Sequence, residues 1–130
     1  MAVRVLVVED DPALARLAEK MLAHAGIEVH VHERGFGVLQ RIATCRPHVL
    51  LLDVMLPGLD GPELVELIRG DPELSRTRVV LWSALSAADL TKRARLCGAD
   101  GSIEKAKGPF HLVAQITDWL RVWDGVDLKA

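Results

Sequence analysis

The sequence contains no tyrosine and only two cysteines, Cys45 and Cys97, which stand far apart and outside any CxxC pair. This spacing argues against a disulfide framework or a cysteine zinc site and predicts free thiols. The longest uninterrupted apolar runs have four residues, as in Val5–Val8 and Val49–Leu52, so none is long enough to cross a bilayer. The chain also opens without the basic and apolar regions of a secretory signal. These absences predict a cytoplasmic protein.

An excess of charge of one sign is lacking too. Sixteen basic side chains stand against eighteen acidic ones, which leaves a formal net charge of −2. Such a balance offers no electrostatic footprint for a nucleic-acid backbone or an anionic membrane. Half of the 130 residues are apolar and 26% are charged, as in a globular domain rather than a disordered chain. This length fits one domain that buries most of its apolar surface.

Short apolar runs predict the strands of a sheet. Val3–Val8, Val49–Leu52 and Val79–Trp82 are rich in β-branched residues or leucine and too short for helices, which suits strands buried on both faces. Ile27–His32 alternates between apolar and polar residues, as an edge strand with one wetter face does. Gly101–Glu104 is a weaker candidate for a fifth strand.

Helical patterns fill the gaps between these runs. They cover Pro12–Ala25, Phe36–Cys45, Pro62–Arg69, Ser86–Leu96 and Pro109–Trp123. A β-α alternation repeated five times predicts an α/β fold, a doubly wound parallel sheet with helices on both faces. We expect one domain over residues 1–124 and a short tail over 125–130. In such sheets, functional groups gather where the strands end.

Polar side chains follow the predicted strands. The first run ends in Glu9 and Asp10, the third strand in Asp53, the fourth in Ser83, and Lys105 follows the fifth. Taken one at a time, several of these residues have an ordinary structural explanation. Ser83 could begin a loop, and Lys105 could be a solvated surface charge. The next residue, Asp11, precedes Pro12 and fits a helix N-cap. Asp53 is harder to explain in this way, because it directly follows four apolar residues.

Together, these residues predict a site for a cation and a phosphoryl group. Two carboxylates about 4 Å apart repel by about 4 kcal/mol at an effective dielectric of 20, so Glu9, Asp10 and Asp53 need a cation between them. Oxygen ligands alone favour a hard ion such as Mg²⁺, or Mn²⁺. A carboxylate could then attack phosphorus, while the metal, Lys105 and the Ser83 hydroxyl stabilise the developing charge.

Four stretches carry a family resemblance, namely VLVVEDDPALARLAEKML, HVLLLDVMLPGLDGPEL, VVLWSALSAADL and GADGSIEK. Residues 3–122 thereby resemble the receiver domains of bacterial two-component response regulators. The resemblance implies a flavodoxin-like sheet of order 2-1-3-4-5. It implies a signalling domain rather than an enzyme, phosphorylated with Mg²⁺ by a histidine kinase or by a phosphotransfer protein of a phosphorelay. A downstream protein of unknown identity would then receive the signal.

The resemblance also implies a role for each position of the site. Asp53 would be the phospho-acceptor, and the backbone carbonyl of Met55 would join the acidic residues as a metal ligand. Ser83 and Lys105 would contact the phosphoryl group. The other metal ligands would be Glu9, Asp10 and Asp53 itself.

Two positions depart from the family pattern. Ala106 stands where a cis-proline usually follows the lysine, and the Pro-Phe pair is displaced to Pro109-Phe110, which predicts a longer loop after the fifth strand. Ser102 stands where an aromatic residue usually rotates inward on activation. The usual aromatic switch therefore cannot operate here.

Other α/β families need residues that this sequence lacks at these positions. A flavodoxin needs a hydroxyl-rich phosphate loop after the first strand, and a dinucleotide-binding domain needs GxGxxG there. A phosphohydrolase of the haloacid dehalogenase kind needs a second Asp two positions after its nucleophile, where Met55 stands. A pseudo-receiver that binds partners without phosphorylation stays open, because the proline and the aromatic residue are missing. We expect no nucleic-acid binding, since the sequence stops soon after the fifth helix.

Two smaller groups of side chains each have a structural and a functional interpretation. His30 and His32 share one face of the second strand but lack an evident third ligand for a metal. Trp119 and Trp123 fit the core of the last helix, and the alternative is a partner-binding surface.

Overall fold

The computed structural model describes residues 2–125, which form one five-stranded parallel sheet and five α-helices in strict alternation. The strand order is β2-β1-β3-β4-β5, as the family resemblance implied. The expected tail falls mostly outside this range, at residues 126–130. The strands are β1 (Arg4–Val8), β2 (Glu28–His32), β3 (Val49–Asp53), β4 (Arg78–Ser83) and β5 (Gly101–Glu104). The helices are α1 (Pro12–His24), α2 (Val38–Cys45), α3 (Gly61–Gly70), α4 (Ala87–Cys97) and α5 (Gly108–Asp124).

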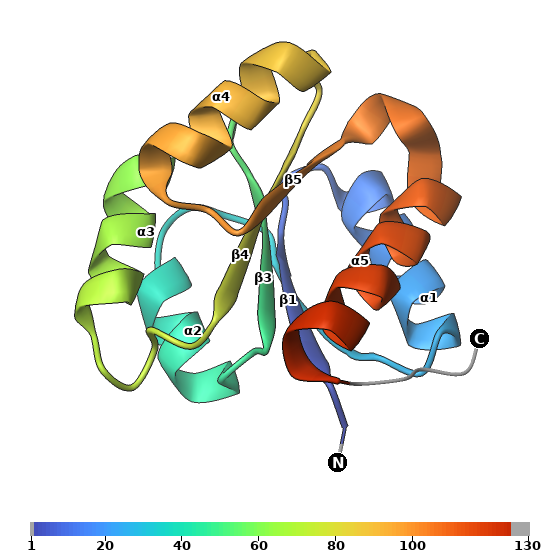
Figure 1. Cartoon of the computed structure of the whole chain (residues 1–130), viewed down its shortest axis with the longest axis horizontal. Coiled ribbons are helices and arrows are strands. Elements are labelled where there is room, and N and C mark those ends of the chain that lie inside the picture. Colours follow the sequence, from blue (N-terminus) through green and yellow to red (C-terminus); the bar gives the residue numbers. More distant parts are fainter. Residues whose placement is uncertain (1, 126–130) are drawn as a thin grey trace.

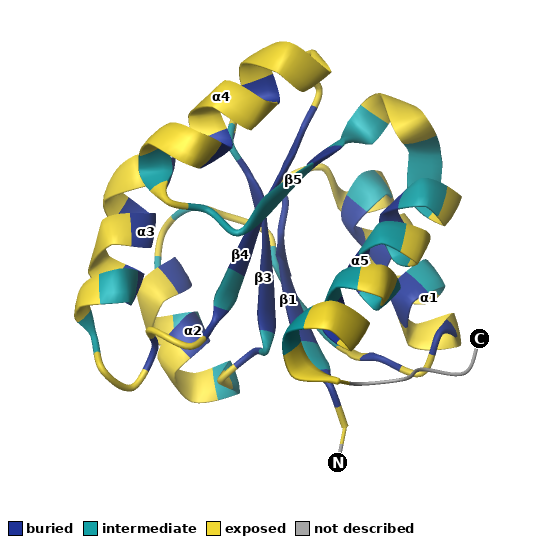
Figure 2. Cartoon of the chain, in the orientation of Figure 1, coloured by how far each residue is buried: buried dark blue, intermediate teal, exposed yellow. Residues whose placement is uncertain are grey.

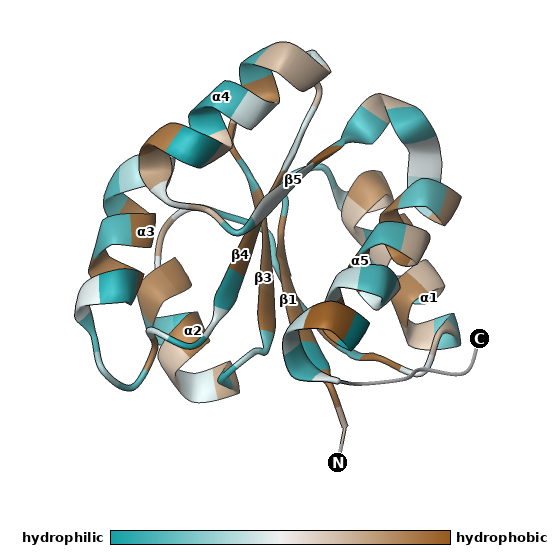
Figure 3. Cartoon of the chain, in the orientation of Figure 1, coloured by the Kyte–Doolittle hydropathy of each residue, from teal (hydrophilic) through white to brown (hydrophobic). Residues whose placement is uncertain are grey.

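The sheet lies between two layers of helices. Helices α2, α3 and α4 cover one face, and α1 and α5 cover the other (Figure 1). Side chains alternate along β3, so Leu50 and Leu52 pack under the first layer while Val49 and Leu51 pack under the second. Buried and apolar residues therefore coincide along the central strands, and the outer helix surfaces are exposed and more polar (Figures 2 and 3).

The edge strand β2 differs from the central ones, as its alternating sequence predicted. It pairs only with β1, and its residues are half-buried or exposed. Val29 and Val31 pack against the core under α1 and α5. His30 contacts Glu28 at 2.9 Å, whereas His32 contacts the Phe36 carbonyl oxygen at 2.7 Å. The two imidazoles thus have separate partners, and the structure gives no support to a shared metal.

Side-chain caps define where three helices begin. The Asp11 carboxylate accepts hydrogen bonds from the Ala13 and Leu14 amides at 3.0 and 3.4 Å, which confirms the predicted N-cap of α1. Asp60 caps α3 and Ser86 caps α4 in the same way, each through the amide three residues later. Helix α2 begins at Val38, two residues later than predicted. Gly37 directly before it has a left-handed backbone with φ of 79°, which a right-handed helix cannot include.

A single 3₁₀ turn, η1 (Lys105–Lys107), joins β5 to α5. Gly108, with a positive φ of 84°, begins α5, and Pro109 then stands in the first turn of this helix, where a missing amide hydrogen is tolerated. This turn occupies the place of the predicted longer loop. It leaves Lys105 next to the end of β5 and so fixes where its side chain starts.

The two tryptophans of α5 belong to the core layer between that helix and the sheet. Trp119 and Trp123 are half-buried and stack on one another, with ring centroids 5.4 Å apart. The Arg78 guanidinium lies 5.3 Å from the centroid of Trp123. At Gly101, a Cβ atom would come within 2.7 Å of the Trp119 ring, so only glycine lets α5 lie this close to β5. This packing supports the core interpretation of both rings.

The remaining general expectations concern thiols and membranes. Cys45 and Cys97 close α2 and α4 and are free thiols, as predicted. Burial raises the pKa of the Cys45 thiol. Among residues 2–125, no helix combines the length and apolar character that a bilayer crossing requires.

Candidate functional site

The carboxyl ends of four strands bring the predicted site residues to one edge of the sheet. Glu9 directly follows β1, and its amide donates to the His32 carbonyl oxygen at 3.1 Å, which extends the pairing with β2. Asp53 ends β3 and pairs in register with Trp82 of β4. Ser83 ends β4, and Lys105 follows β5. Parallel pairing therefore gathers residues that lie up to 96 positions apart in the sequence.

Three carboxylates come together at this edge. One oxygen from each of Glu9, Asp10 and Asp53 lies within 4.8 Å of the others. Glu9 and Asp53 are only 1% and 4% exposed, while Asp10 faces solvent. The predicted acidic group is confirmed, and it is the one group of three potential metal-ligating side chains within the described part of the chain.

Lys105 bridges the two buried carboxylates. Its Nζ lies 2.7 Å from Glu9 Oε1 and 3.2 Å from Asp53 Oδ2. The same ammonium group lies 5.1 Å from the centroid of the Trp82 ring. The alternative in which Lys105 is a solvated surface charge is wrong, because its side chain is largely buried against these partners.

The carboxyl group of Glu9 is incompletely satisfied. Its Oε2 is buried and has no hydrogen-bond partner. Burial, together with the neighbouring Asp53, raises the pKa of Glu9 to about 7, although Lys105 acts in the opposite direction. A buried oxygen without a partner, next to two more carboxylates, fits a hard cation with oxygen ligands.

The pKa of Asp53 is shifted in the opposite direction from that of Glu9. Burial alone would raise its pKa, but the neighbouring Glu9 carboxyl, the Met55 amide and Lys105 together hold the pKa below its ordinary value. The Met55 amide donates to Asp53 Oδ1 at 2.9 Å, which places the Met55 backbone at the site. Asp53 is therefore an ionised carboxylate at neutral pH, held in place by an amide and an ammonium group.

Ser83 shares the edge of the sheet with the acidic group. Its side chain is fully buried, and its Oγ accepts a hydrogen bond from the Leu85 amide at 3.2 Å. The hydroxyl therefore holds the start of the loop that leads into α4, as a loop-forming serine would. Its own hydrogen remains available to an acceptor at the site.

Sequence reasoning placed Trp82 in a buried strand and missed its position beside Lys105. The signal was present, because Trp82 precedes Ser83 and lies next to Asp53 across the sheet. The alternation along β4 sends Trp82 to the face covered by α1 and α5. Ser102 is half-buried on β5, opposite Leu81 in register, so a small side chain does occupy the predicted switch position.

Comparison with known proteins identifies the family. The protein-family model described as the response regulator receiver domain matches residues 5–117. The chain belongs to this family. As a receiver, it is a signalling domain rather than a classical enzyme. Its acidic group of Glu9, Asp10 and Asp53 is typical of receivers that accept phosphate and could bind a metal ion.

Individual relatives agree with this assignment. Protein PilG of Pseudomonas aeruginosa is 29% identical over 113 residues, which cover 87% of this chain and 84% of PilG. The DNA-binding response regulator MtrA of Mycolicibacterium smegmatis is 33% identical over 121 residues, and this receiver spans 93% of its own length but only 52% of MtrA. The BeF₃-activated receiver domain of Thermotoga maritima DrrB superposes with a TM-score of 0.78 at 27% identity, covering 93% of this chain and 99% of that one.

We expect Asp10→Ala to weaken Mg²⁺ binding without destabilising the metal-free receiver. Loss of one carboxylate removes an attraction for the cation and should lower the affinity about tenfold or more. The same loss relieves repulsion from Glu9 and Asp53, so the metal-free melting temperature should hold or rise. Thermal melts over a Mg²⁺ titration measure both effects.

Glu19→Ala is the matched control, because Glu19 is exposed on α1 away from the acidic group. It should leave the Mg²⁺ dependence of the melting temperature unchanged. A stabilisation of Asp10→Ala by Mg²⁺ equal to that of the unmodified chain would contradict the metal assignment.

Proposed function

We propose that this receiver accepts a phosphoryl group on Asp53 from a histidine kinase or a phosphotransfer protein and relays the signal through a protein partner in the cytoplasm. The observation that carries the proposal is the setting of Asp53. Its carboxylate is buried and ionised, with Lys105 Nζ 3.2 Å from Oδ2 and the Met55 amide 2.9 Å from Oδ1. A nucleophile and its charge-stabilising groups therefore meet in one place.

The proposed reaction is a direct phosphoryl transfer. An oxygen of Asp53 forms a bond to phosphorus as the bond from phosphorus to the donor's imidazole nitrogen breaks, and the imidazole leaves with the bonding electrons. Lys105 is placed to offset the negative charge that collects on the phosphoryl oxygens. The Ser83 hydroxyl donates to one of these oxygens, since its hydrogen is not used by the Leu85 contact.

A divalent cation fits beside the acceptor. Glu9, Asp10 and Asp53 would hold Mg²⁺ or Mn²⁺ together with the backbone carbonyl of Met55, and the unpartnered Oε2 of Glu9 supports this set. When bound, the cation supplies Lewis-acid neutralisation of the transferred group. The Glu9 carboxyl must be ionised to serve as a ligand, so its raised pKa makes the metal compete with a proton below about pH 7.

Incubation with acetyl phosphate and Mg²⁺ tests the proposal. Intact mass spectrometry should show one added phosphoryl group, and the adduct should disappear when a chelator replaces Mg²⁺. Survival of the fold under both conditions is checked by circular dichroism. A chain that binds Mg²⁺ but gains no phosphoryl group would instead be a pseudo-receiver that binds partners without phosphorylation.

We expect beryllofluoride, a mimic of the phosphoryl group, to change only part of the receiver. Ser83 begins the loop into α4, so backbone amide shifts should concentrate in Ser83–Ala88 and the first turn of α4. Ser102 is too small to fill the space that such a movement opens, so little change should reach Gly101–Glu104 or Pro109–Trp123. Two-dimensional amide spectra with and without beryllofluoride measure this spread.

Asp53→Asn is the control for that experiment, because it should show no beryllofluoride-dependent shifts at all. Large shifts throughout β5 and α5 in the unmodified chain would mean that another residue has replaced the aromatic switch.

A further inference from the structure

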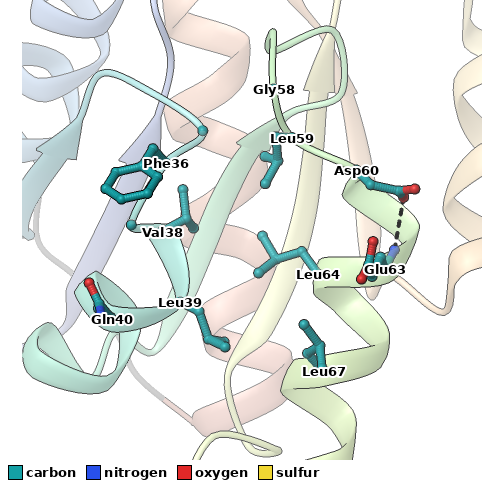
Figure 4. A pocket seen from close by; sticks show the side chains of 12 residues that line it. Phe36, Val38, Leu39, Gln40, Gly58, Leu59, Asp60, Glu63, Leu64 and Leu67 are labelled. Carbon is teal, nitrogen blue, oxygen red and sulfur yellow. Dashed lines mark hydrogen bonds between the residues drawn. The ribbon is translucent and has the colours of Figure 1, made fainter.

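A groove runs between α2 and α3, on the side of the sheet away from α5. Its upper part has a volume of about 380 Å³ and continues into a second hollow along α3, with Leu39, Glu63 and Leu67 shared by both. Figure 4 shows Leu39 on α2 and Leu64 and Leu67 on α3 extending into the space between the two helices.

Large apolar side chains line this groove and remain accessible. Phe36 is 83% exposed, Leu67 50% and Leu39 37%, although each is a large apolar side chain. Scattered exposed leucines are ordinary on a protein surface, but these three line one continuous hollow. A contiguous apolar patch beside a groove is typical of a surface that contacts another protein.

The charges around the groove all have one sign. Asp60, Glu63, Glu66 and Asp71 line its two hollows, and no lysine, arginine or histidine is among the described residues that line them. His32, Arg34 and Arg41 line an adjoining hollow that meets the groove at Phe36. The groove itself therefore offers apolar contacts next to negative charge, and a basic ligand complements it.

The loop after Asp53 fixes the upper end of the groove. At Gly35, a Cβ atom would come within 2.9 Å of Leu59 Cβ and 3.0 Å of the Pro57 carbonyl oxygen. Only glycine lets the chain that leads into α2 lie against this loop, and Phe36 follows directly. The packing of Gly35 against this loop thus fixes the shape of the groove, which lies beside the acidic site rather than over it.

We propose that the α2–α3 groove binds an amphipathic helix of a partner protein, with apolar residues along one face and lysine or arginine beside them. Helix α3 has ten residues and is about 15 Å long, which matches about three turns of a docked helix. Such a helix presents apolar side chains at positions i, i+3 or i+4, and i+7. They would pack among Phe36, Leu39 and Leu67, and the basic residues would face Glu63 and Glu66.

A designed peptide tests this surface without a known partner. The probe is a helix of about 14 residues with leucines on one face and lysines elsewhere. A second peptide replaces every lysine by glutamate, and a third replaces every leucine by serine. Titration into the ¹⁵N-labelled chain should shift amides that line the groove for the first peptide, and neither of the other two should bind there.

Variants of the chain separate groove binding from general attraction to a basic peptide. Leu67→Ser and Glu66→Lys should each weaken the leucine–lysine peptide about fivefold or more. The matched controls are Leu96→Ser, at an apolar position 77% exposed on α4, and Glu19→Lys on α1. Both controls should bind within about twofold of the unmodified chain.

Four outcomes would overturn the proposal. They are absence of binding, amide shifts centred on α4 or α5, equal binding of the glutamate peptide, and no effect of Leu67→Ser. Sedimentation of the chain alone adds a fifth, because a dimer dissolved by Leu67→Ser would show that a second copy occupies the groove. None of these outcomes depends on phosphorylation, so the test stands or fails apart from the acceptor role of Asp53.

Discussion

Asp53→Asn is expected to abolish Mg²⁺-dependent labelling by acetyl phosphate while the domain stays folded. An amide has nearly the shape of a carboxylate but is not a nucleophile towards phosphorus. The Asn oxygen can still accept the hydrogen bond that the Met55 amide gives to Asp53 Oδ1, so the turn after β3 should persist. Lys105 keeps its contact of 2.7 Å with Glu9. Intact mass spectrometry measures the labelling, and thermal melts measure the fold.

Asp60→Asn is the matched control for this substitution. Asp60 belongs to the same β3–α3 segment but caps α3, and asparagine caps helices about as well as aspartate. Its labelling should equal that of the unmodified chain. Undiminished labelling of Asp53→Asn would place the acceptor elsewhere, with the exposed Asp10 the first candidate.

Lys105→Met should strongly destabilise the metal-free receiver at alkaline pH. Methionine keeps most of the length of the side chain but removes the ammonium group that bridges Glu9 and Asp53. Loss of one partner from a buried ion pair typically costs about 3–5 kcal/mol. Because Lys105 is 17% exposed and partly screened, we expect about 2–3 kcal/mol at pH 8. Urea unfolding in the presence of a chelator measures the difference.

The loss should shrink at lower pH, and the sign follows from Glu9. Its pKa is raised from 4.5 to about 7 by burial and by Asp53. A carboxyl group with a raised folded-state pKa favours folding most at low pH, and this contribution fades as pH rises through the folded-state pKa. At pH 6 a proton on Glu9 takes over part of the role of Lys105, so the destabilisation should be smaller there. Mg²⁺ should restore stability at pH 8.

Lys107→Met supplies the control, because Lys107 lies in the same 3₁₀ turn but makes only an exposed contact of 3.7 Å with Glu104. Its effect should stay within about 0.5 kcal/mol at both pH values. Equal stability of Lys105→Met and the unmodified chain at pH 8 would show that the bridge contributes nothing. Lys105→Met should also slow labelling by acetyl phosphate on the order of a hundredfold.

The sheet and the acidic group could be predicted because both depend on local patterns and on one topological rule. Apolar runs identify strands such as Val49–Asp53, and the carboxyl ends of parallel strands must share an edge. The sequence alone therefore predicts that Glu9, Asp10 and Asp53 lie together. The Asp11 cap of α1 could be predicted in the same way, since it joins residues only two or three positions apart.

Other features depend on three-dimensional packing and could not be predicted. The bridge from Lys105 to Glu9 and Asp53 requires the orientation of a side chain after the η1 turn. The start of α2 depends on the left-handed backbone of Gly37, which glycine permits but does not require. The α2–α3 groove exists only because two helices lie at a particular distance, and no residue pattern encodes that distance.

The position of Trp82 has a consequence for spectroscopy. The chain has no tyrosine and three tryptophans, so its near-ultraviolet fluorescence comes from indole groups alone. Trp123 lies 5.3 Å from the Arg78 guanidinium, at the opposite end of β4, and Trp119 stacks on Trp123 and packs against Gly101. The Trp82 ring instead lies 5.1 Å from the Lys105 ammonium. A ligand that draws Lys105 away from Glu9 should therefore change the electric field at Trp82 more than at the other two rings. The receiver therefore carries an intrinsic, label-free optical probe of its own acidic site.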